Sequence, residues 1–405
     1  MLTYTYEARN TVTGQRVKAE VQADNEQTAA KLIKEQGLTP LSIKLSRQAF
    51  SGYFKRISTK DKVMFSRQLA TLINAGLPLV QSLRNVGQQT TSKPMRVVIN
   101  NVISDVESGK AFSQALSKHP KVFNRVFVSL VAAGETSGTL DTGLERLADQ
   151  QEKDADVISK VRGAMIYPAI VLLVMIAVVG FMIVKVLPQV QSIYAGLPGV
   201  SLPLPTRVML GISHFITNYW WIVIIIIVFL IVAFTRISRS IAGKKIVDKV
   251  KMRSWPFGPL FMKMYMARFA RTGTTLVASG VPLLQVLEIT GDAVDNVHIS
   301  KSLKLAADKV KGGKALSDSL ANDPNFLELI PNMIKIGEQS GSLETMLDKA
   351  ASYFEKEVDN EIKTISTIIE PVLMVIMGAV ALTIVAAVLL PIYGLVNQSG
   401  FTNNI

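Results

Sequence analysis

A long segment of this chain occurs twice, and the repeat limits the folds that the chain can adopt. The phrase FSRQLATLINAGLPLVQSL begins at Phe65 and returns as FARTGTTLVASGVPLLQVL at Phe269. The match continues through GETSGTL and GEQSGSL, then through an apolar run, and ends at Pro188 and Pro391. Because repetition on this scale means that a structural unit has been duplicated, the fold of the first copy should recur in the second.

Three apolar blocks contain most of the hydrophobic excess of the chain, which has 405 residues, 49% of them hydrophobic. The block from Pro168 to Leu187 would form about 30 Å of helix, which matches the hydrocarbon core of a bilayer. We expect transmembrane helices at residues 164–187, 215–235 and 370–396. The first and third helices close the two copies of the repeat, so each copy is a polar helical unit followed by a membrane helix.

Basic residues gather beside these apolar blocks. The formal charge of +13 therefore indicates membrane topology rather than nucleic-acid binding. Seven basic residues follow the second block against a single acidic residue, Asp248, and Lys160 with Arg162 precedes the first block. Since cytoplasmic flanks carry the excess of Lys and Arg, we expect a cytosolic N-terminus and an external C-terminus. The N-terminal residues have no pattern of a cleaved signal peptide.

The remaining patterns divide the chain into units. Residues 1–45 read as a strand, strand, helix, strand module, and 46–60 as a linker. From Asp61 the apolar spacing is helical and predicts about six short helices, with Ser58 or Thr59 capping the first. The predicted units that follow are cytosolic bundle 1 at 61–163, an external loop at 188–214, a basic cytosolic segment at 236–264, cytosolic bundle 2 at 265–369 and an external tail at 397–405.

These units define a fold class. We expect a mainly α polytopic membrane protein with two homologous cytosolic six-helix bundles, three transmembrane helices and a small N-terminal α/β module.

Motifs for catalysis and cofactor binding are absent from the sequence. The chain has no cysteine, which excludes disulfides, thiolate metal sites and cysteine nucleophiles. The GKAF and GGKALS segments lack the first glycine and the Ser or Thr of a phosphate loop, and the three histidines are far apart. No nucleophile elbow or HExxH pattern occurs. We therefore expect no enzyme activity and no cofactor.

A Gly-Glu-x-Ser-Gly turn occurs in both copies and has two interpretations. The simpler one is a tight corner in which Gly134 ends one helix and Thr139 caps the next. The other assigns Glu135 and Glu338 to a partner protein, because the turn does not require a carboxylate. The repeated positions that we assign to a partner contact or structural motif are Gly134, Glu135, Ser137, Gly138, Gly337, Glu338, Ser340, Gly341, Arg67, Arg271, Pro78 and Pro282.

Two further carboxylate features are candidate sites. Glu145 and Asp149 share a helix face and could hold a divalent cation through oxygen ligands, with a solvated acidic face as the alternative. In the second copy Ser352 replaces Asp149, so one ligand would be lost. Glu370 stands before the third span, where the first copy has Tyr167. It is a candidate for a polar contact at membrane level, with a place in the headgroup layer as the alternative.

The two phrases, each followed by the G-E-x-S-G turn and a Pro-bounded membrane helix, resemble the type II secretion system F family from about Asp61 to Val396. The N-terminal module is similar to one that many members carry. The resemblance implies a non-enzymatic platform of the bacterial cytoplasmic (inner) membrane in a type IV pilus or type II secretion machine. Its implied partners are a hexameric assembly ATPase, pilins or pseudopilins, other inner-membrane assembly proteins and the lipid bilayer. Nucleic acid is not among them, and we expect a homo-oligomer.

Two other classes of protein stay open at this point. A small-solute transporter usually has more spans and polar or broken helices near the midplane, whereas these spans are few and almost uncharged. A passive membrane anchor would not need a duplicated bundle. One difference between the copies is that Gly273 stands where the first copy has Leu69. We therefore expect the opening helix of bundle 2 to pack less tightly.

Overall fold

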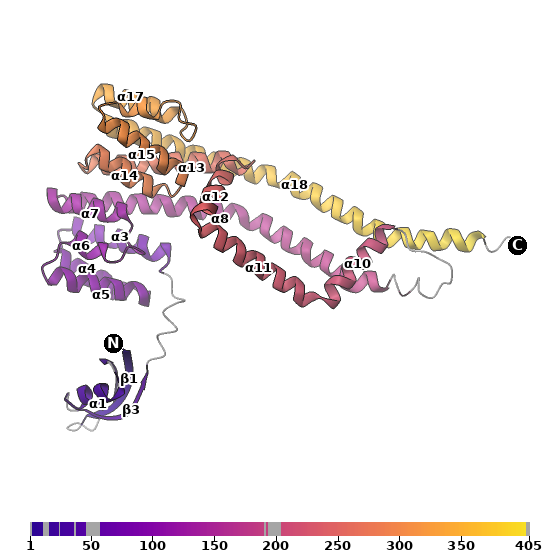
Figure 1. Cartoon of the computed structure of the whole chain (residues 1–405), viewed down its shortest axis with the longest axis horizontal. Helices are drawn as coiled ribbons and strands as arrows, with labels where there is room; N and C mark the ends of the chain where they lie inside the picture. The colour runs from indigo at the N-terminus through magenta and orange to yellow at the C-terminus, as the bar shows by residue number, and fades with distance from the viewer. Residues whose placement is uncertain are drawn as a thin grey trace.

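The computed structural model describes residues 2–10, 16–23, 25–35, 38–45, 57–189, 192 and 204–401. Two helical bundles lie side by side at one end, and long helices extend from them in a common direction (Figure 1). The chain is mainly α-helical with three candidate transmembrane helices, which confirms the predicted fold class.

The N-terminal module contains β1 (Leu2–Asn10), β2 (Arg16–Ala23), α1 (Glu26–Glu35) and β3 (Leu38–Leu45). The strands form one antiparallel sheet in the order β2-β1-β3. The side chain of Asn25 caps α1 by accepting a 2.8 Å hydrogen bond from the backbone N–H of residue 28. The predicted order of strand, strand, helix and strand is confirmed.

Bundle 1 has six helices, as predicted. They are α3 (Thr59–Asn74), α4 (Leu79–Gln89), α5 (Lys93–Glu107), α6 (Phe112–Ser117), α7 (Arg125–Ser137) and the first part of α8 (Leu140–Phe181). A capping box starts the bundle, because Ser58 and Asp61 each accept a 3.1 Å hydrogen bond from the backbone N–H of the other. Three aromatic rings fill its core with centroids 4.8–6.4 Å apart, namely those of Phe65, Phe123 and Phe127.

Bundle 2 repeats this arrangement. Its helices are α13 (Phe257–Ala278), α14 (Leu283–Ala293), α15 (Val297–Lys311), α16 (Leu316–Leu320), α17 (Leu329–Ser340) and the first part of α18 (Leu343–Phe401). A Cβ atom added at Gly273 would lie 3.3 Å from Leu347 Cδ1. The glycine lets α18 approach the backbone of α13, so the expectation of looser packing is wrong at this position.

The corner between the first two helices of each bundle uses the same residues in both copies. Gly76 and Gly280 have φ angles of +83° and +75°, which residues with a side chain rarely adopt. Pro78 and Pro282 then stand at the N-cap positions of α4 and α14. The repeated Gly-x-Pro therefore reverses the direction of the chain. Pro78 and Pro282, which we assigned to a partner contact or structural motif, thus have a structural role.

The long helices continue from the bundles into the apolar blocks. Three helical segments are long and apolar enough to cross a membrane, namely Leu140–Gln189, Trp220–Ser238 and Leu343–Ala386. At most 6% of the most apolar window of each is buried within the chain, as expected for surfaces that face lipid. The second segment belongs to α11 (Trp220–Arg239). Pro168 and Pro371 lie inside α8 and α18 rather than at their ends.

Two predicted boundaries differ from the structure, and the basic segment is found to contain a helix. The external loop was predicted to reach residue 214, but α10 occupies Leu204–Asn218, because a proline in the first turn is compatible with a helix. The basic segment contains a helix, α12 (Ile241–Arg253). Helix α18 continues to Phe401 and includes part of the predicted tail, whose last residues, 402–405, lie outside the described residues.

Helix α10 packs against the end of the first span that lies away from the bundles (Figure 1). There α8 continues into a π-helical segment, η1 (Met182–Val186). The Ser213 hydroxyl of α10 donates a 2.5 Å hydrogen bond to the Ile183 carbonyl of this segment. Leu187 and Leu210 are both almost fully buried.

Candidate functional site: two arginine clamps and the contact between the bundles

The first helix of bundle 1 is fastened to α8 by one arginine. The Arg67 guanidinium on α3 donates from Nε and Nη2 to the two carboxylate oxygens of Glu152, both at 2.6 Å. It also reaches Asp149 at 2.5 Å and Glu145 at 2.6 Å, one and two turns earlier on α8. A bidentate arginine–carboxylate pair fixes both distance and orientation. We call Arg67 with these three carboxylates clamp 1.

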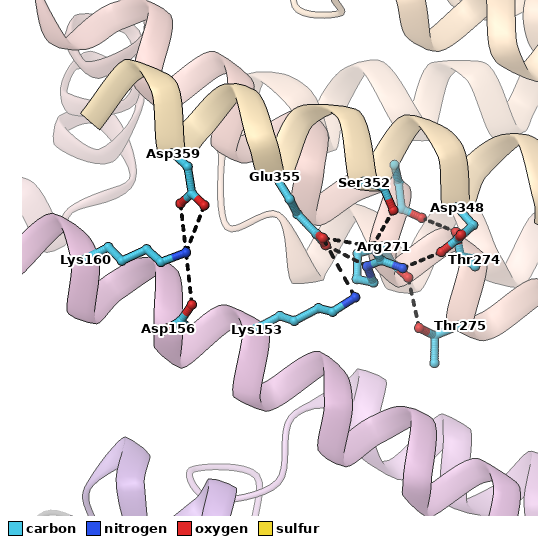
Figure 2. A network of polar contacts seen from close by, with 11 residues as sticks. Lys153, Asp156, Lys160, Arg271, Thr274, Thr275, Asp348, Ser352, Glu355 and Asp359 are labelled. Carbon is cyan, nitrogen blue, oxygen red and sulfur yellow. Dashed lines mark hydrogen bonds and ion pairs between the residues drawn. The ribbon is translucent and has the colours of Figure 1, made fainter. Parts of the chain in front are cut away.

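Bundle 2 contains the same arrangement, which we call clamp 2. Arg271 on α13 donates to both carboxylate oxygens of Glu355 at 2.7 and 3.0 Å, and to Asp348 at 2.5 Å (Figure 2). The fourth member is Ser352, whose hydroxyl lies 3.3 Å from Arg271 Nη2. The side chain of Arg271 is 13% exposed against 30% for Arg67, so clamp 2 is the more buried of the two.

The clamps shift the pKa values of their members. The hydrogen bonds that Arg67 donates to Glu152 raise the pKa of Arg67 above its usual value, and they lower the pKa of Glu152. For Arg271, burial lowers the pKa, but the hydrogen bond and charge of Glu355 outweigh burial and the net direction is upward. Both guanidinium groups therefore stay charged at any physiological pH.

The predicted cation ligands Glu145 and Asp149 belong to clamp 1. Their positive partner in the structure is the guanidinium of Arg67. Among the residues that the structure describes, no group of three His, Cys, Asp or Glu is placed to hold a metal ion. A divalent-cation site at this pair stays a prediction, and it would require Arg67 to give up its two hydrogen bonds.

The Gly-Glu-x-Ser-Gly motif forms a tight corner, but not at the predicted residue. Helix α7 runs through Gly134 and ends at Gly138, whose φ of +74° gives a left-handed C-terminal cap; Gly341 has φ +66° in the second copy. Gly134 serves a close approach instead, because a Cβ there would lie 3.0 Å from the Leu140 backbone. Thr139 is at the N-cap position of α8 without capping it.

The hydroxyl groups of this corner bond to each other. In the first copy Ser137 Oγ lies 2.6 Å from the Thr139 hydroxyl, and in the second copy Ser340 and Ser342 are the same distance apart. The second corner also repeats the close approach, since a Cβ at Gly337 would lie 2.8 Å from the Leu343 backbone. Both corners therefore have the same structure.

The glutamate of the motif has an internal partner in both copies. Glu135 accepts hydrogen bonds from the backbone N–H groups of Phe112 and Ser113 at 2.5 and 3.1 Å, at the start of α6. Glu338 does the same at the start of α16. A carboxylate is favourable at a helix N-terminus, because it satisfies free N–H groups and faces the positive end of the helix dipole. The structure thus explains these glutamates within the bundle, and their contact with a partner protein stays a prediction.

Glu370 lies on the surface of α18 and is exposed. It has no ion pair or side-chain hydrogen bond within the described part of the chain. Tyr167, at the equivalent position of α8, is also exposed. A polar contact of Glu370 at membrane level therefore stays a prediction.

The bundles contact each other through α8 and α18. Lys160 on α8 reaches Asp359 on α18 at 2.9 Å, and Lys153 lies 3.8 Å from Glu355 of clamp 2 (Figure 2). A buried hydrogen bond of 2.9 Å joins the Gln150 amide to the hydroxyl of Thr272 on α13. Clamp 2 is thus part of the contact between bundles as well as of bundle 2.

The motif search missed Glu152 and Glu355, the bidentate partners of the two arginines. Each lies seven residues after the first acidic member of its clamp, and the repeat preserves this spacing. The signal was therefore present, but it identifies the glutamates only when they are compared between copies.

The duplicated helical unit, ending in a helix that passes into an apolar span, defines a polytopic α-helical membrane protein with an internal repeat. The profile of the family "Type II secretion system (T2SS), protein F" matches residues 65–188 and 269–391, and the profile of its N-terminal domain matches residues 1–44. The chain belongs to this family.

Full-length relatives carry two kinds of name. The type IV pilus assembly protein PilC of Myxococcus xanthus is 37% identical over 97% of this chain and 94% of its own length. PilC of Thermus thermophilus is 36% identical over 98% of both chains. The type II secretion system protein F of Vibrio cholerae is 32% identical over 94% of this chain and 95% of its own length.

Proposed function

We propose that this protein is a non-enzymatic inner-membrane platform of a type IV pilus or type II secretion machine. It couples a hexameric assembly ATPase in the cytosol to the extraction and polymerisation of pilins or pseudopilins. Family membership and the names of the full-length relatives support the machine. The polarity of the chain supports the placement, because basic residues flank the spans on the side of the two bundles.

The observation that carries the coupling role is the continuity between bundle and span. Each of α8 and α18 is one uninterrupted helix from its bundle into its apolar segment. Clamp 1 fixes α3 to α8, and clamp 2 fixes α13 to α18. A force applied to a bundle would therefore move the span with it, since the connection has no flexible loop.

The membrane part fits a helical client better than a solute. An apolar hollow of about 360 Å³ lies between α8 and α18. Its lining is Ile170, Val171, Val174, Met175, Val178, Met377, Val380, Ala381 and Ile384. Such a surface can accept another apolar helix, whereas transport of a small polar solute needs polar groups at this depth.

The experiment is affinity purification of the tagged full-length chain from its native membrane, with identification of the bound proteins. We expect a hexameric ATPase and at least one pilin or pseudopilin. Replacing both Arg67 and Arg271 by Leu should leave these partners bound but reduce assembly, because the spans would no longer follow the bundles. Absence of both partners from the wild-type sample would contradict the proposal. A measurement of the thermal unfolding of the double variant controls for loss of fold.

The structure also changes how a motor contact at Glu135 and Glu338 should be tested. Reversing their charges would place a positive group at the N-termini of α6 and α16 and would destabilise the bundles. Loss of the ATPase from such a variant would therefore not identify a contact. Substitutions on neighbouring exposed positions, with these two glutamates kept, are the suitable test.

A further inference from the structure

The two copies of the repeat contact each other through different faces. Bundle 1 uses α7 and α8, and bundle 2 uses α13, α14 and α18. If the contact were two-fold symmetric, the same helices would appear on both sides. The contact is therefore heterologous. In each bundle, the face equivalent to the one that the other bundle uses for the contact is left uncovered. We call these the open α17/α18 face of bundle 2 and the open α3/α4 face of bundle 1.

Six ion pairs between described residues hold the contact between the bundles, three between α8 and α18, two between α7 and α14 and one between α8 and α13. On α8, Arg146, Lys153 and Lys160 recur every seven residues and face acidic residues on α18. The pairs are Arg146–Glu344 and Lys153–Glu355, both at 3.8 Å, and Lys160–Asp359 at 2.9 Å. On α7, Arg125 reaches Glu288 of α14 at 3.1 Å, and Asp292 at 2.9 Å.

The repeat places a complementary pair at the equivalent position in four of the six cases, namely the three pairs between α8 and α18 and the pair Arg125–Glu288. The equivalents of the three α8 cations are Lys349, Lys356 and Lys363 on the open face of α18, and those of the three α18 acids are Asp141, Glu152 and Asp156 on α8. For the fourth pair both signs are reversed. Arg125 corresponds to Glu328 and Glu288 corresponds to Arg84. Because both signs are reversed, Glu328 and Arg84 would still attract each other. This attraction requires that the two open faces contact each other.

These groups are available for a partner. Lys349, Lys356, Lys363 and Glu328 are all exposed, and none has an ion pair or side-chain hydrogen bond within the described residues. Arg84 has 61% of its side chain exposed although it binds Glu107.

The buried hydrogen bond between the bundles also has a counterpart. Gln150 and Thr272 correspond to Tyr353 and Gln68, which can form the same kind of bond, and the Tyr353 ring is 50% exposed. Two ion pairs do not recur. Asp292, the second partner of Arg125, corresponds to Gln88, and Asp154 and Arg268, 3.8 Å apart, correspond to Glu357 and Met64.

The long helices set the size of the assembly. At 3.6 residues per turn, the cationic and the acidic rows of α8 point roughly 90° apart, and those of α18 do the same. Both bundles lie on one side of the membrane. Successive bundles are therefore related by a rotation about the membrane normal, without a shift along the normal. Four long helices with corners of about 90° close a ring.

We infer that a second copy of this chain binds head-to-tail, with the open α17/α18 face of each chain on the open α3/α4 face of the other. Two chains then give a closed ring of four bundles. This inference rests on the repeat and its charges, and it does not depend on the proposed function.

Cysteine cross-linking tests the predicted contact, and the chain has no cysteine of its own. Glu328→Cys and Arg84→Cys are made in two full-length chains with different tags, co-expressed in membranes and treated with a short bis-maleimide. We expect a cross-linked dimer that carries both tags, and none from either variant alone. The matched control is one chain with Arg125→Cys and Glu288→Cys, which should cross-link internally without forming a dimer. If this control reacts and the two-tag product is absent, the inference is wrong.

Charge reversal gives an independent test. Glu328→Arg should weaken dimerisation of the full chain in detergent by about tenfold, because it sets two arginines opposite each other. Arg84→Glu in the same chain should restore it. An unchanged thermal unfolding temperature would show that the variants are folded. A wild-type chain that is monomeric in the membrane, or a double variant as weak as the single one, would overturn the proposal.

Discussion

At the scale of single residues, the carboxylate of Glu152 makes the stability of bundle 1 depend on pH. Its hydrogen bonds to Arg67 lower its pKa below the usual 4.5. A group whose pKa is lower in the folded state stabilises the fold above its unfolded pKa, and this contribution disappears as the pH falls through the folded pKa. The side chain is 43% exposed, so the contribution is about 1 kcal/mol. We expect Glu152→Gln to lower the unfolding temperature of the full chain at pH 7, by an amount that decreases as the pH falls below 4.5.

The control for this prediction is Asp308→Asn, because Asp308 is exposed and has no side-chain partner in the described part of the chain. Its unfolding should follow that of the wild type throughout the pH range. A deficit of Glu152→Gln that is equally large at pH 7 and pH 3 would show that the clamp does not act through the charge of this carboxylate.

Glu135 supports a second prediction at this scale, because it caps a short helix from outside. Replacement by Ala would leave the N–H groups of Phe112 and Ser113 without their charged acceptor. Loss of a helix cap costs about 1 kcal/mol. We expect faster amide hydrogen exchange in α6 than elsewhere in bundle 1. Uniform protection of α6 in Glu135→Ala would contradict the capping role.

At the scale of elements, the sequence predicts well what depends on neighbouring residues. The N-cap at Ser58, one of the two residues predicted for it, and the apolar spans follow from short patterns, and the structure confirms them. The repeat adds the six-helix unit twice. The clamps could not be predicted in the same way, because Arg67 and its carboxylates are 78 to 85 residues apart and meet only when α3 packs on α8.

Other differences have similar causes. The prediction of an external loop at 188–214 missed α10, since a proline is compatible with the first turn of a helix. The interpretation of Glu145 and Asp149 as an isolated acidic pair omitted the arginine that a distant helix supplies. The end of α7 was placed at the wrong glycine of its motif, because sequence does not reveal which glycine adopts a positive φ.

Continuity of α8 can be tested at Gly163, which lies between bundle 1 and the apolar part of the helix and has open space where a side chain would stand. Gly163→Ala should keep full assembly activity, because alanine favours the helix by about 1 kcal/mol. Gly163→Pro removes a helix hydrogen bond and bends the axis. We expect it to reduce pilus or pseudopilus assembly while partner binding and the unfolding of the bundles are kept. Equal activity of the two variants would show that the machine does not need a rigid α8.

At the scale of the whole molecule, the copies have the same fold but different surroundings. The α7/α8 face of bundle 1 is covered by bundle 2, whereas the equivalent face of bundle 2 is open. Clamp 2 lies at the contact and is more buried than clamp 1. Duplication within one chain has therefore produced two positions that are not equivalent, and a partner can distinguish them.

The orientation of the whole molecule in the membrane gives the last prediction. Helix α12 and its flanks carry seven Lys and Arg residues and one acidic residue, Asp248. In residues 188–214 the only Lys or Arg is Arg207. The excess of basic residues predicts that α12 lies in the cytosol and α10 outside. In the cysteine-free chain, Arg207→Cys on α10 should react with an impermeant maleimide in spheroplasts, because the side chain is exposed. Lys245→Cys on α12 should react only after the membrane is opened, and the unsubstituted chain should not react at all. The opposite order of labelling would place both bundles outside the cytosol, where no cytosolic ATPase could reach them.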